Sequence, residues 1–318
     1  MSHSIVLKYD DTLWVTGKNG YGQLGDGTTD DKEQFTFVKV FRGAKTVVAG
    51  GWHSMLLTAT GAVWGTGWNK YGQLGEVDTN HTTFSLVWQP AMEDAKAVAA
   101  GHLHSLVLKS DGSVWAAGRN ANGQLGDASR LDRGYFVQPQ DSDGHAVMAV
   151  AVAAGGYHSL ALTADSRVLA TGWNAHGQLG DRSLEPEDLD RTTFQSVFYG
   201  VKAVSAGTRH SMVLTEEGSL WTTGHNSHGE LGDDSLASTR NFVRVIPTGV
   251  EAIAAGGFHS MALRIDGSVW ASGSNEYGQI GDGSMWNFEA FNRVALARER
   301  ALQHVAPPHL PRALSVRA

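Results

Sequence analysis

A histidine-serine pair recurs six times along this chain of 318 residues, at intervals of 49 to 54 residues. A tryptophan stands eleven residues after five of the histidines, and Leu169 holds that place in the fourth copy. Nineteen residues after each histidine, a glycine opens the phrase Gly-Gln-Leu-Gly-Asp or a near variant. Repetition at this period is typical of solenoids and propellers, in which each copy is one supersecondary unit. The histidines are His3, His53, His104, His158, His210 and His259.

Each copy is expected to form four strands. In the third copy, two apolar runs at 104–109 and 113–118 flank a turn containing Asp111-Gly112, and Asp-Gly is a strong hairpin signal. A third strand is expected in the variable half of the copies, at 37–40, 242–245 and 291–294. A fourth is expected in the small-residue runs before the histidines, at 47–49, 98–100, 152–154 and 253–255. Four strands per copy predict an all-β fold, a β-propeller with six blades.

The two ends of the chain suggest how the ring closes. The first copy begins at its histidine and lacks the Val-Ala-Ala strand that precedes the others. Residues 302–306 have the place and character of that strand, so we expect them to pair with the first blade and remove two free sheet edges. This interpretation gives one propeller domain over 1–306 and a tail over 307–318. The alternative is a fragment of a seven-bladed protein that lost one copy.

Composition excludes several classes of function. A net charge of −7 gives no reason to expect nucleic acid or an anionic membrane as a partner. The absence of cysteine excludes disulfides, thiol catalysis and cysteine-bound zinc. No apolar run of about 18 residues is present, and residues 1–4 do not begin a secretion signal. We therefore expect a monomeric protein of the cytoplasm or nucleus.

The repeated polar residues are interpreted as structural. Equivalent histidines in different blades lie too far apart to share one metal ion, so we expect them to bond local backbone groups. His102 and His104 lack a nearby acidic ligand, and His225 and His228 are interpreted as loop residues. No Ser-His-Asp arrangement, phosphate-binding loop or carboxylate pair stands out, so no catalytic residue, metal site or cofactor is predicted. The repeat tryptophans and Leu169 are expected to pack between blades. Acidic residues expected to cap turns are Asp26, Glu76, Asp127, Asp181, Asp233 and Asp282.

These phrases resemble the regulator of chromosome condensation repeat. The resemblance rests on Ala-Gly-x-x-His-Ser, Asp-Gly-x-Val-Trp and Gly-x-Asn-x-x-Gly-Gln-Leu-Gly-Asp, and it covers the chain from His3 to about Ala306. It implies a propeller but leaves function open, because this propeller carries many unrelated activities. Family members with exchange activity on the GTPase Ran have seven blades, whereas six copies are visible here. The repeat is also similar to that of the plant UV-B photoreceptor, whose light-sensing tryptophans lie two residues before the histidine. Here those positions hold Gly51, His102, Gly156, Thr208 and Gly257, so no photoreceptor is predicted.

Positions that vary between copies point to a partner. They precede the repeat histidine, precede the repeat asparagine or follow that asparagine by two residues, and all flank turns. Tyrosine, tryptophan and arginine there are typical anchors of protein interfaces. The candidates are Tyr21, Trp52, Trp68, Tyr71, Tyr157, Trp173, Arg209, Phe258 and Tyr277.

The prediction is a non-enzymatic protein-binding module or scaffold. The alternatives are a guanine nucleotide exchange factor for a Ran-like small GTPase and, more distantly, a proteinaceous enzyme inhibitor, since the repeat is similar to that of a bacterial β-lactamase inhibitor.

Overall fold

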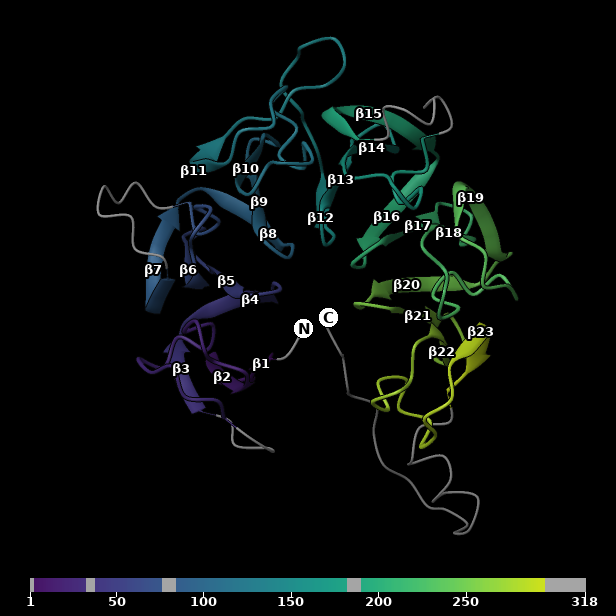
Figure 1. The fold of residues 1–318 in the computed structure, drawn as a ribbon, viewed down its shortest axis with the longest axis horizontal. Coiled ribbons are helices and arrows are strands. Elements are labelled where there is room, and N and C mark those ends of the chain that lie inside the picture. Colours follow the sequence, from purple (N-terminus) through teal and green to yellow (C-terminus); the bar gives the residue numbers. More distant parts are fainter. Residues whose placement is uncertain (1–2, 33–37, 76–83, 182–189, 295–318) are drawn as a thin grey trace.

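The described residues of the computed structural model, 3–32, 38–75, 84–181 and 190–294, form 23 strands in six antiparallel sheets. The sheets stand around a common centre as the blades of a propeller (Figure 1). The predicted all-β fold with one blade per repeat is therefore confirmed. Within these ranges there is no helix long and apolar enough to cross a membrane.

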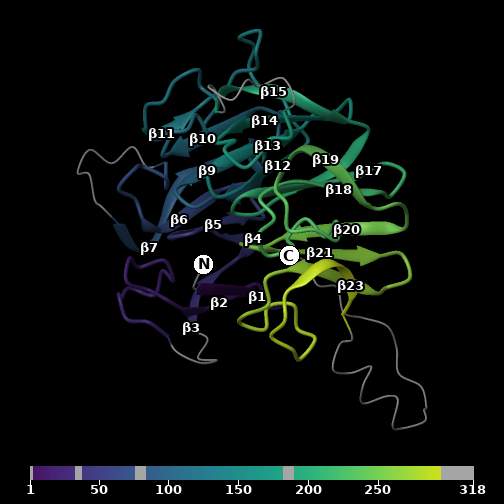
Figure 2. The same cartoon turned by 45° about the vertical axis from the view of Figure 1, so that its right-hand side comes forward.

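Strands run outward from the centre in chain order. The innermost strands are β4, β8, β12, β16 and β20, and the outermost strands lie at the rim, an order that is also visible in the turned view (Figures 1 and 2). Blade one contains β1 (His3–Leu7), β2 (Thr12–Gly17) and β3 (Val38–Arg42). Blade two contains β4 (Ala44–Ala49), β5 (His53–Thr58), β6 (Val63–Trp68) and β7 (Phe84–Met92). Blade three contains β8 (Ala95–Ala100), β9 (His104–Lys109), β10 (Val114–Gly118) and β11 (Arg133–Val137).

The remaining three blades repeat this arrangement. Blade four contains β12 (Ala151–Ala154), β13 (His158–Leu162), β14 (Arg167–Gly172) and β15 (Arg191–Tyr199). Blade five contains β16 (Val201–Ala206), β17 (His210–Thr215), β18 (Leu220–Gly224) and β19 (Thr239–Ile246). Blade six contains β20 (Val250–Ala255), β21 (His259–Arg264), β22 (Val269–Gly273) and β23 (Phe288–Arg293).

The predicted hairpin is present in blade three. Val114 of β10 pairs with Leu108 of β9, and Gly112 turns the chain with a φ of 89°. The carboxylate of Asp111 accepts hydrogen bonds from the backbone N–H and the hydroxyl of Ser113, at 2.9 and 2.6 Å. An Asp-Gly pair suits this turn because aspartate bonds the backbone two residues on and glycine tolerates the positive φ.

Blade one has three strands in the described residues, because no inner strand precedes β1 there. This agrees with the prediction that the first copy lacks that strand. Residues 302–306 and the domain boundary at 306 lie outside the described residues, so ring closure stays a prediction.

The repeat tryptophans of blades two, three, five and six pack between blades, as predicted. Trp115 of blade three lies against a cluster that includes Met55 and Leu57 of blade two. Leu169 takes the same place in blade four and packs with Leu108 of blade three. The five repeat tryptophans are half-buried, and four of their indole N–H groups donate to a hydroxyl two residues earlier. Such bonds run from Trp14 to Thr12, Trp115 to Ser113, Trp221 to Ser219 and Trp270 to Ser268.

The repeat histidines bond a different partner from the one predicted. Five of them place Nε2 within 2.8 to 3.0 Å of a serine hydroxyl in the following blade, rather than on local backbone. The sequence could not indicate this partner because the contact crosses about fifty residues of chain. The pairs are His3–Ser54, His53–Ser105, His104–Ser159, His158–Ser211 and His210–Ser260.

Candidate protein-binding face

Aromatic rings from blades one and two pack together where their turns meet. The ring of Tyr21 stacks on Trp68 with centroids 4.8 Å apart and planes 11° apart. Tyr21 also meets Trp52 edge to face at 5.4 Å, and Trp68 contacts Tyr71 at 5.9 Å. Stacked and edge-to-face pairs at these distances are attractive beyond the apolar area that they bury.

Two arginines extend this packing across blades three to five. The guanidinium of Arg119 lies 5.6 Å from the ring of Tyr71 in blade two and 5.7 Å from the ring of Tyr157 in blade four. Tyr157 meets Trp173 edge to face at 5.7 Å, and Arg209 of blade five lies 5.6 Å from Trp173. Cations held over aromatic faces in this way are stabilised by the ring quadrupole.

Histidines carry the contacts on to blade six. The ring of Trp173 contacts His176 at 5.1 Å, and His176 contacts His225 at 4.7 Å. Phe258 of blade six meets His225 at 6.4 Å and His228 at 5.4 Å. An unbroken series of ring and cation contacts therefore spans all six blades. We call it the aromatic belt: Tyr21, Trp52, Trp68, Tyr71, His102, Arg119, Tyr157, Trp173, His176, Arg209, His225, His228 and Phe258.

Repeated turns hold the belt in place. In blade three, the side-chain amide of Asn120 donates to Asp127 at 2.8 Å, and its oxygen accepts from the backbone N–H of Leu125 at 3.0 Å. Asp127 also accepts from the N–H of Ser129, so the predicted capping of this turn is confirmed. The same Asp-capped turn recurs at Asp26, Asp233 and Asp282, whereas Glu76 lies outside the described residues.

Eight of the nine predicted binding residues lie in the belt. Trp52 and Phe258 are 40% and 37% exposed, and the other six are half-buried. The ninth, Tyr277, is 87% exposed and makes no ring contact with any described residue. Sequence reasoning missed Arg119 and the belt histidines, although most of them occupy the same variable repeat positions. From the sequence, His225 and His228 are interpreted as loop residues, and only their packing places them with the aromatics.

Blade five carries a polar cluster that includes two belt residues. The buried carboxylate of Glu230 binds Nδ1 of His225 through one oxygen and accepts from the backbone N–H of His228 at 2.9 Å through the other. The hydroxyl of Ser227 lies 3.2 Å from Nε2 of His225 and 3.2 Å from Nδ1 of His228. Burial, followed by the nearby charges of His225 and Arg209, lowers the pKa of His176. The imidazoles of His225 and His228 and the carboxylate of Glu230 are groups of the kind that bind a cation. The signal that could have found the cluster is Glu230, which stands where the other copies have glutamine.

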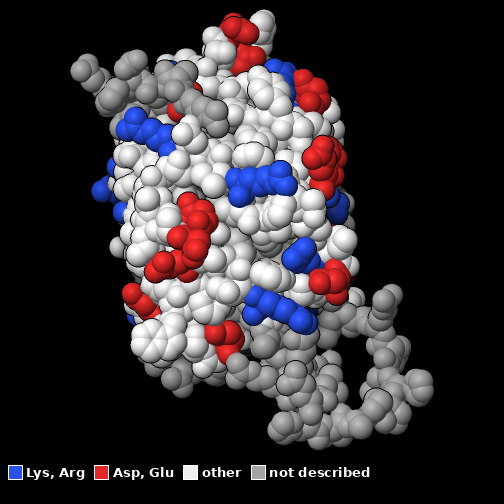
Figure 3. All heavy atoms as spheres, turned by 90° about the vertical axis from the view of Figure 1, so that its right-hand side faces the viewer, with Lys and Arg blue, Asp and Glu red and all other residues white. Residues whose placement is uncertain are grey.

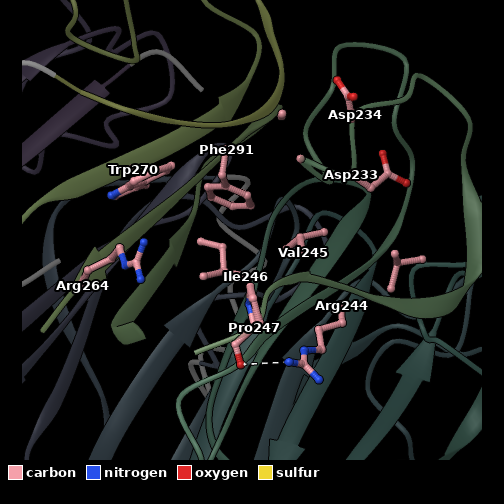
Figure 4. Close-up of a pocket in the computed structure, with 12 residues that line it drawn as sticks. Asp233, Asp234, Arg244, Val245, Ile246, Pro247, Arg264, Trp270 and Phe291 are labelled. Carbon is pink, nitrogen blue, oxygen red and sulfur yellow. Dashed lines mark hydrogen bonds between the residues drawn. The ribbon is translucent and has the colours of Figure 1, made fainter. Parts of the chain in front are cut away.

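A separate cavity of about 390 Å³ lies between blades five and six (Figure 4). Phe291, Trp270 and Ile246 line it, with Asp233 and Asp234 on the loop above and Arg264 on the opposite side. The carboxylate of Asp233 is occupied by its own turn, where it accepts from Asn226 and Ser235. Asp233 therefore does not offer a free carboxylate to a small molecule in the cavity.

Charges on the outer side of the molecule are mixed. In the view of Figure 3, lysine and arginine alternate with aspartate and glutamate, and neither sign gathers into a patch. That surface offers no broad basic area of the kind that binds a phosphate backbone.

The fold and its repeats define a regulator of chromosome condensation propeller. The sequence profile of the RCC1-like domain matches residues 89–308, and that of the regulator of chromosome condensation (RCC1) repeat matches residues 10–57 and 44–73. The chain belongs to this family, as the resemblance of its repeats indicated.

Two relatives match most of this chain. The ultraviolet-B receptor UVR8 of Arabidopsis thaliana is 31% identical over 243 residues, 74% of this chain and 54% of the receptor. The secretion-regulating guanine nucleotide exchange factor of Mus musculus is 32% identical over 72% of this chain and 52% of its own length. The chain thus spans about half the length of these relatives. The crystal structure of Prp20p from Saccharomyces cerevisiae superposes with a TM-score of 0.77 over 93% of this chain and 76% of Prp20p, at 21% identity.

Proposed function

We propose that this propeller is a protein-binding module and that the aromatic belt is its contact surface. The observation that carries the proposal is the continuity of the belt, whose ring and arginine contacts run from Tyr21 in blade one to Phe258 in blade six. Large, partly exposed aromatic and arginine side chains supply most of the affinity at protein interfaces.

The belt is also prepared for binding. Each belt side chain is held by a ring or cation contact with a neighbour. Side chains that are ordered before binding lose less conformational entropy when a partner docks. A single small-molecule pocket would concentrate its groups in one cavity, whereas the belt presents anchors across several blades.

Truncation of single anchors tests the proposal. Trp52→Ala and Trp173→Ala should each weaken partner affinity by roughly thirtyfold, which corresponds to about 2 kcal/mol for a hot-spot residue. Affinity capture followed by mass spectrometry identifies the partner, and titration calorimetry with the purified partner measures the dissociation constant. The matched control is Trp286→Ala, because Trp286 is 79% exposed and lies outside the belt. Equal losses of affinity in the control and in the belt variants would refute the belt as the contact surface.

Exchange activity is the second candidate, favoured by the similarity to the secretion-regulating guanine nucleotide exchange factor. An exchange factor would accelerate nucleotide release from a small GTPase at sub-stoichiometric concentration. We expect no acceleration with a Ran-like GTPase. Clear acceleration that is lost in the belt variants would make the belt an exchange surface instead.

A further inference from the structure

One position of the repeat changes its chemistry in blade five. The phrase after the repeat asparagine carries Gln23, Gln73, Gln124, Gln178 and Gln279 in five copies and Glu230 in the fifth blade. Each glutamine accepts, through Oε1, the backbone N–H two residues before it. Glu230 keeps this bond, because its Oε2 accepts from the N–H of His228 at 2.9 Å. The structural role of the position is therefore preserved, and the added negative charge is not needed for the turn.

The second oxygen of Glu230 meets another blade-specific residue. In blade six, the amide of Gln279 donates to Ser274, the residue that precedes the repeat asparagine, at 3.0 Å. In blade five, that neighbour is His225, and its Nδ1 binds Oε1 of Glu230. Blade five thus differs from blade six at both positions, and the side chains it carries there, His225 and Glu230, are both of kinds that bind metals.

The charge of Glu230 lies in an unfavourable place unless a cation compensates it. Its side chain is 0% exposed, and its ion pairs with other described residues go to His225 and His228 alone, with no lysine or arginine. A buried carboxylate is costly unless it is paired or coordinates a metal. Two imidazoles and one carboxylate therefore face one another, and no lysine or arginine among the described residues pairs with that carboxylate.

We propose that His225, His228 and Glu230 bind a divalent transition metal of the Zn²⁺ type. One ligand atom from each residue lies within 4.8 Å of the others, and Nδ1 of His228 is 3.9 Å from Oε2 of Glu230. Zinc binds imidazole nitrogen and carboxylate oxygen at about 2.0–2.2 Å, so small shifts of these side chains would close the site. The side chain of His228 is 33% exposed on a turn and has room for such a shift.

The ligand set also indicates the kind of ion. Calcium and magnesium prefer oxygen ligands throughout, whereas two imidazoles with one carboxylate suit zinc and its first-row neighbours. Three protein ligands leave a fourth position open to water or to a side chain of a bound protein. The other cluster found in the described residues, Asp141, Asp143 and His145, has no buried member and serves as an internal comparison.

Titration with ZnCl₂ tests the proposal. The full chain, free of any histidine tag and stripped of metal with EDTA, is titrated by calorimetry, and bound Co²⁺ is followed by its visible absorption. We expect one Zn²⁺ site in the wild type. Glu230→Gln should weaken it at least about tenfold, and His225→Ala should do the same. Glutamine occupies the same position in the other five copies, so Glu230→Gln should not lower the urea midpoint of the metal-free protein.

Two control variants make the result specific. His145→Ala removes the imidazole of the exposed cluster and should leave the Zn²⁺ site intact. Ser227→Ala removes the hydroxyl that contacts both imidazoles and should also leave Zn²⁺ affinity within about threefold of the wild type. The proposal is wrong if no Zn²⁺ binds, if Glu230→Gln binds as tightly as the wild type, or if Ser227→Ala weakens binding as much as Glu230→Gln.

Discussion

The Nε2 atom of His53 in blade two lies 2.8 Å from the hydroxyl of Ser105 in blade three. Ser105 donates its one hydroxyl hydrogen to the backbone carbonyl of Gln73, back in blade two, at 2.7 Å. Ser105 must therefore accept from His53, which places the imidazole proton on Nε2. The same pair of hydrogen bonds, from histidine to serine and from serine to a backbone carbonyl, joins every successive pair of blades in the described residues, and we call it the His-Ser relay. The repeat His-Ser pair thus links each blade to the next.

Ser105→Ala should lower the free energy of unfolding by about 1–3 kcal/mol. The substitution leaves the buried N–H of His53 and the carbonyl of Gln73 without this partner, and unsatisfied buried polar groups carry a cost of that size. Urea denaturation measures the change. Ser4→Ala is the matched control, since Ser4 holds the same repeat position but is exposed, and it should change stability by less than about 0.5 kcal/mol. Equal destabilisation by the two substitutions would contradict the relay.

Stability should fall as the pH drops below about 6.5. Burial lowers the pKa of His53, His104, His158 and His210 from 6.5 to about 3. Between these values the unfolded chain binds more protons than the folded one, so the free energy of unfolding decreases with falling pH. The stability that the neutral buried histidines contribute is fully present above pH 6.5.

Each buried histidine should contribute at most about 1.4 kcal/mol per pH unit to the slope of the free energy of unfolding against pH. Urea denaturation from pH 4 to 7 measures the slope. His158→Gln should reduce it by one proton's contribution, whereas His145→Gln, at an exposed site, should not. A stability profile that is flat below pH 6.5 would overturn the assignment of neutral buried histidines.

Gly155→Ala should destabilise the propeller by about 1–3 kcal/mol or more. A methyl group at this position would lie 2.1 Å from the ring of His158 and 2.7 Å from the carbonyl of Gly207 in the next blade, and overpacking of this kind strains a well-packed interior. Thermal melting measures the effect. Gly20→Ala is the control, because a methyl group there meets no atom within 4 Å. An unchanged melting temperature for Gly155→Ala would show that the blades are less closely packed at the centre than described.

Trp115→Ala should cost about 3 kcal/mol, near the lower end of the range for buried tryptophans, because the indole is only half-buried. Trp115→Leu should cost clearly less, since Leu169 fills the same position in blade four at 7% exposure. Denaturant unfolding compares the two. If both variants lose equal stability, the hydrogen bond from the indole to Ser113, rather than inter-blade packing, is the main contribution of Trp115.

Local features of the fold could be predicted from the residues. The Asp111-Gly112 turn, the β9–β10 hairpin and the inner strands over Ala95–Ala100 and Val250–Ala255 depend on contacts between neighbours in sequence. Because the pattern occurs six times, each copy was expected to form the same four-stranded blade. Packing of the repeat tryptophans between blades also followed, because a large apolar side chain at one strand position has no other place to be buried.

The partners of individual side chains were decided by tertiary structure. Which serine accepts the hydrogen bond from His53, and whether Arg119 meets Tyr71 and Tyr157, depends on how adjacent blades are rotated and spaced. The belt and the His225–His228–Glu230 cluster arise in the same way, because they join residues on separate turns or separate blades. Sequence alone determined the repeating unit through local turn chemistry and strand periodicity. Only the assembled ring decided which variable residues meet, because that outcome depends on contacts made once every fifty residues.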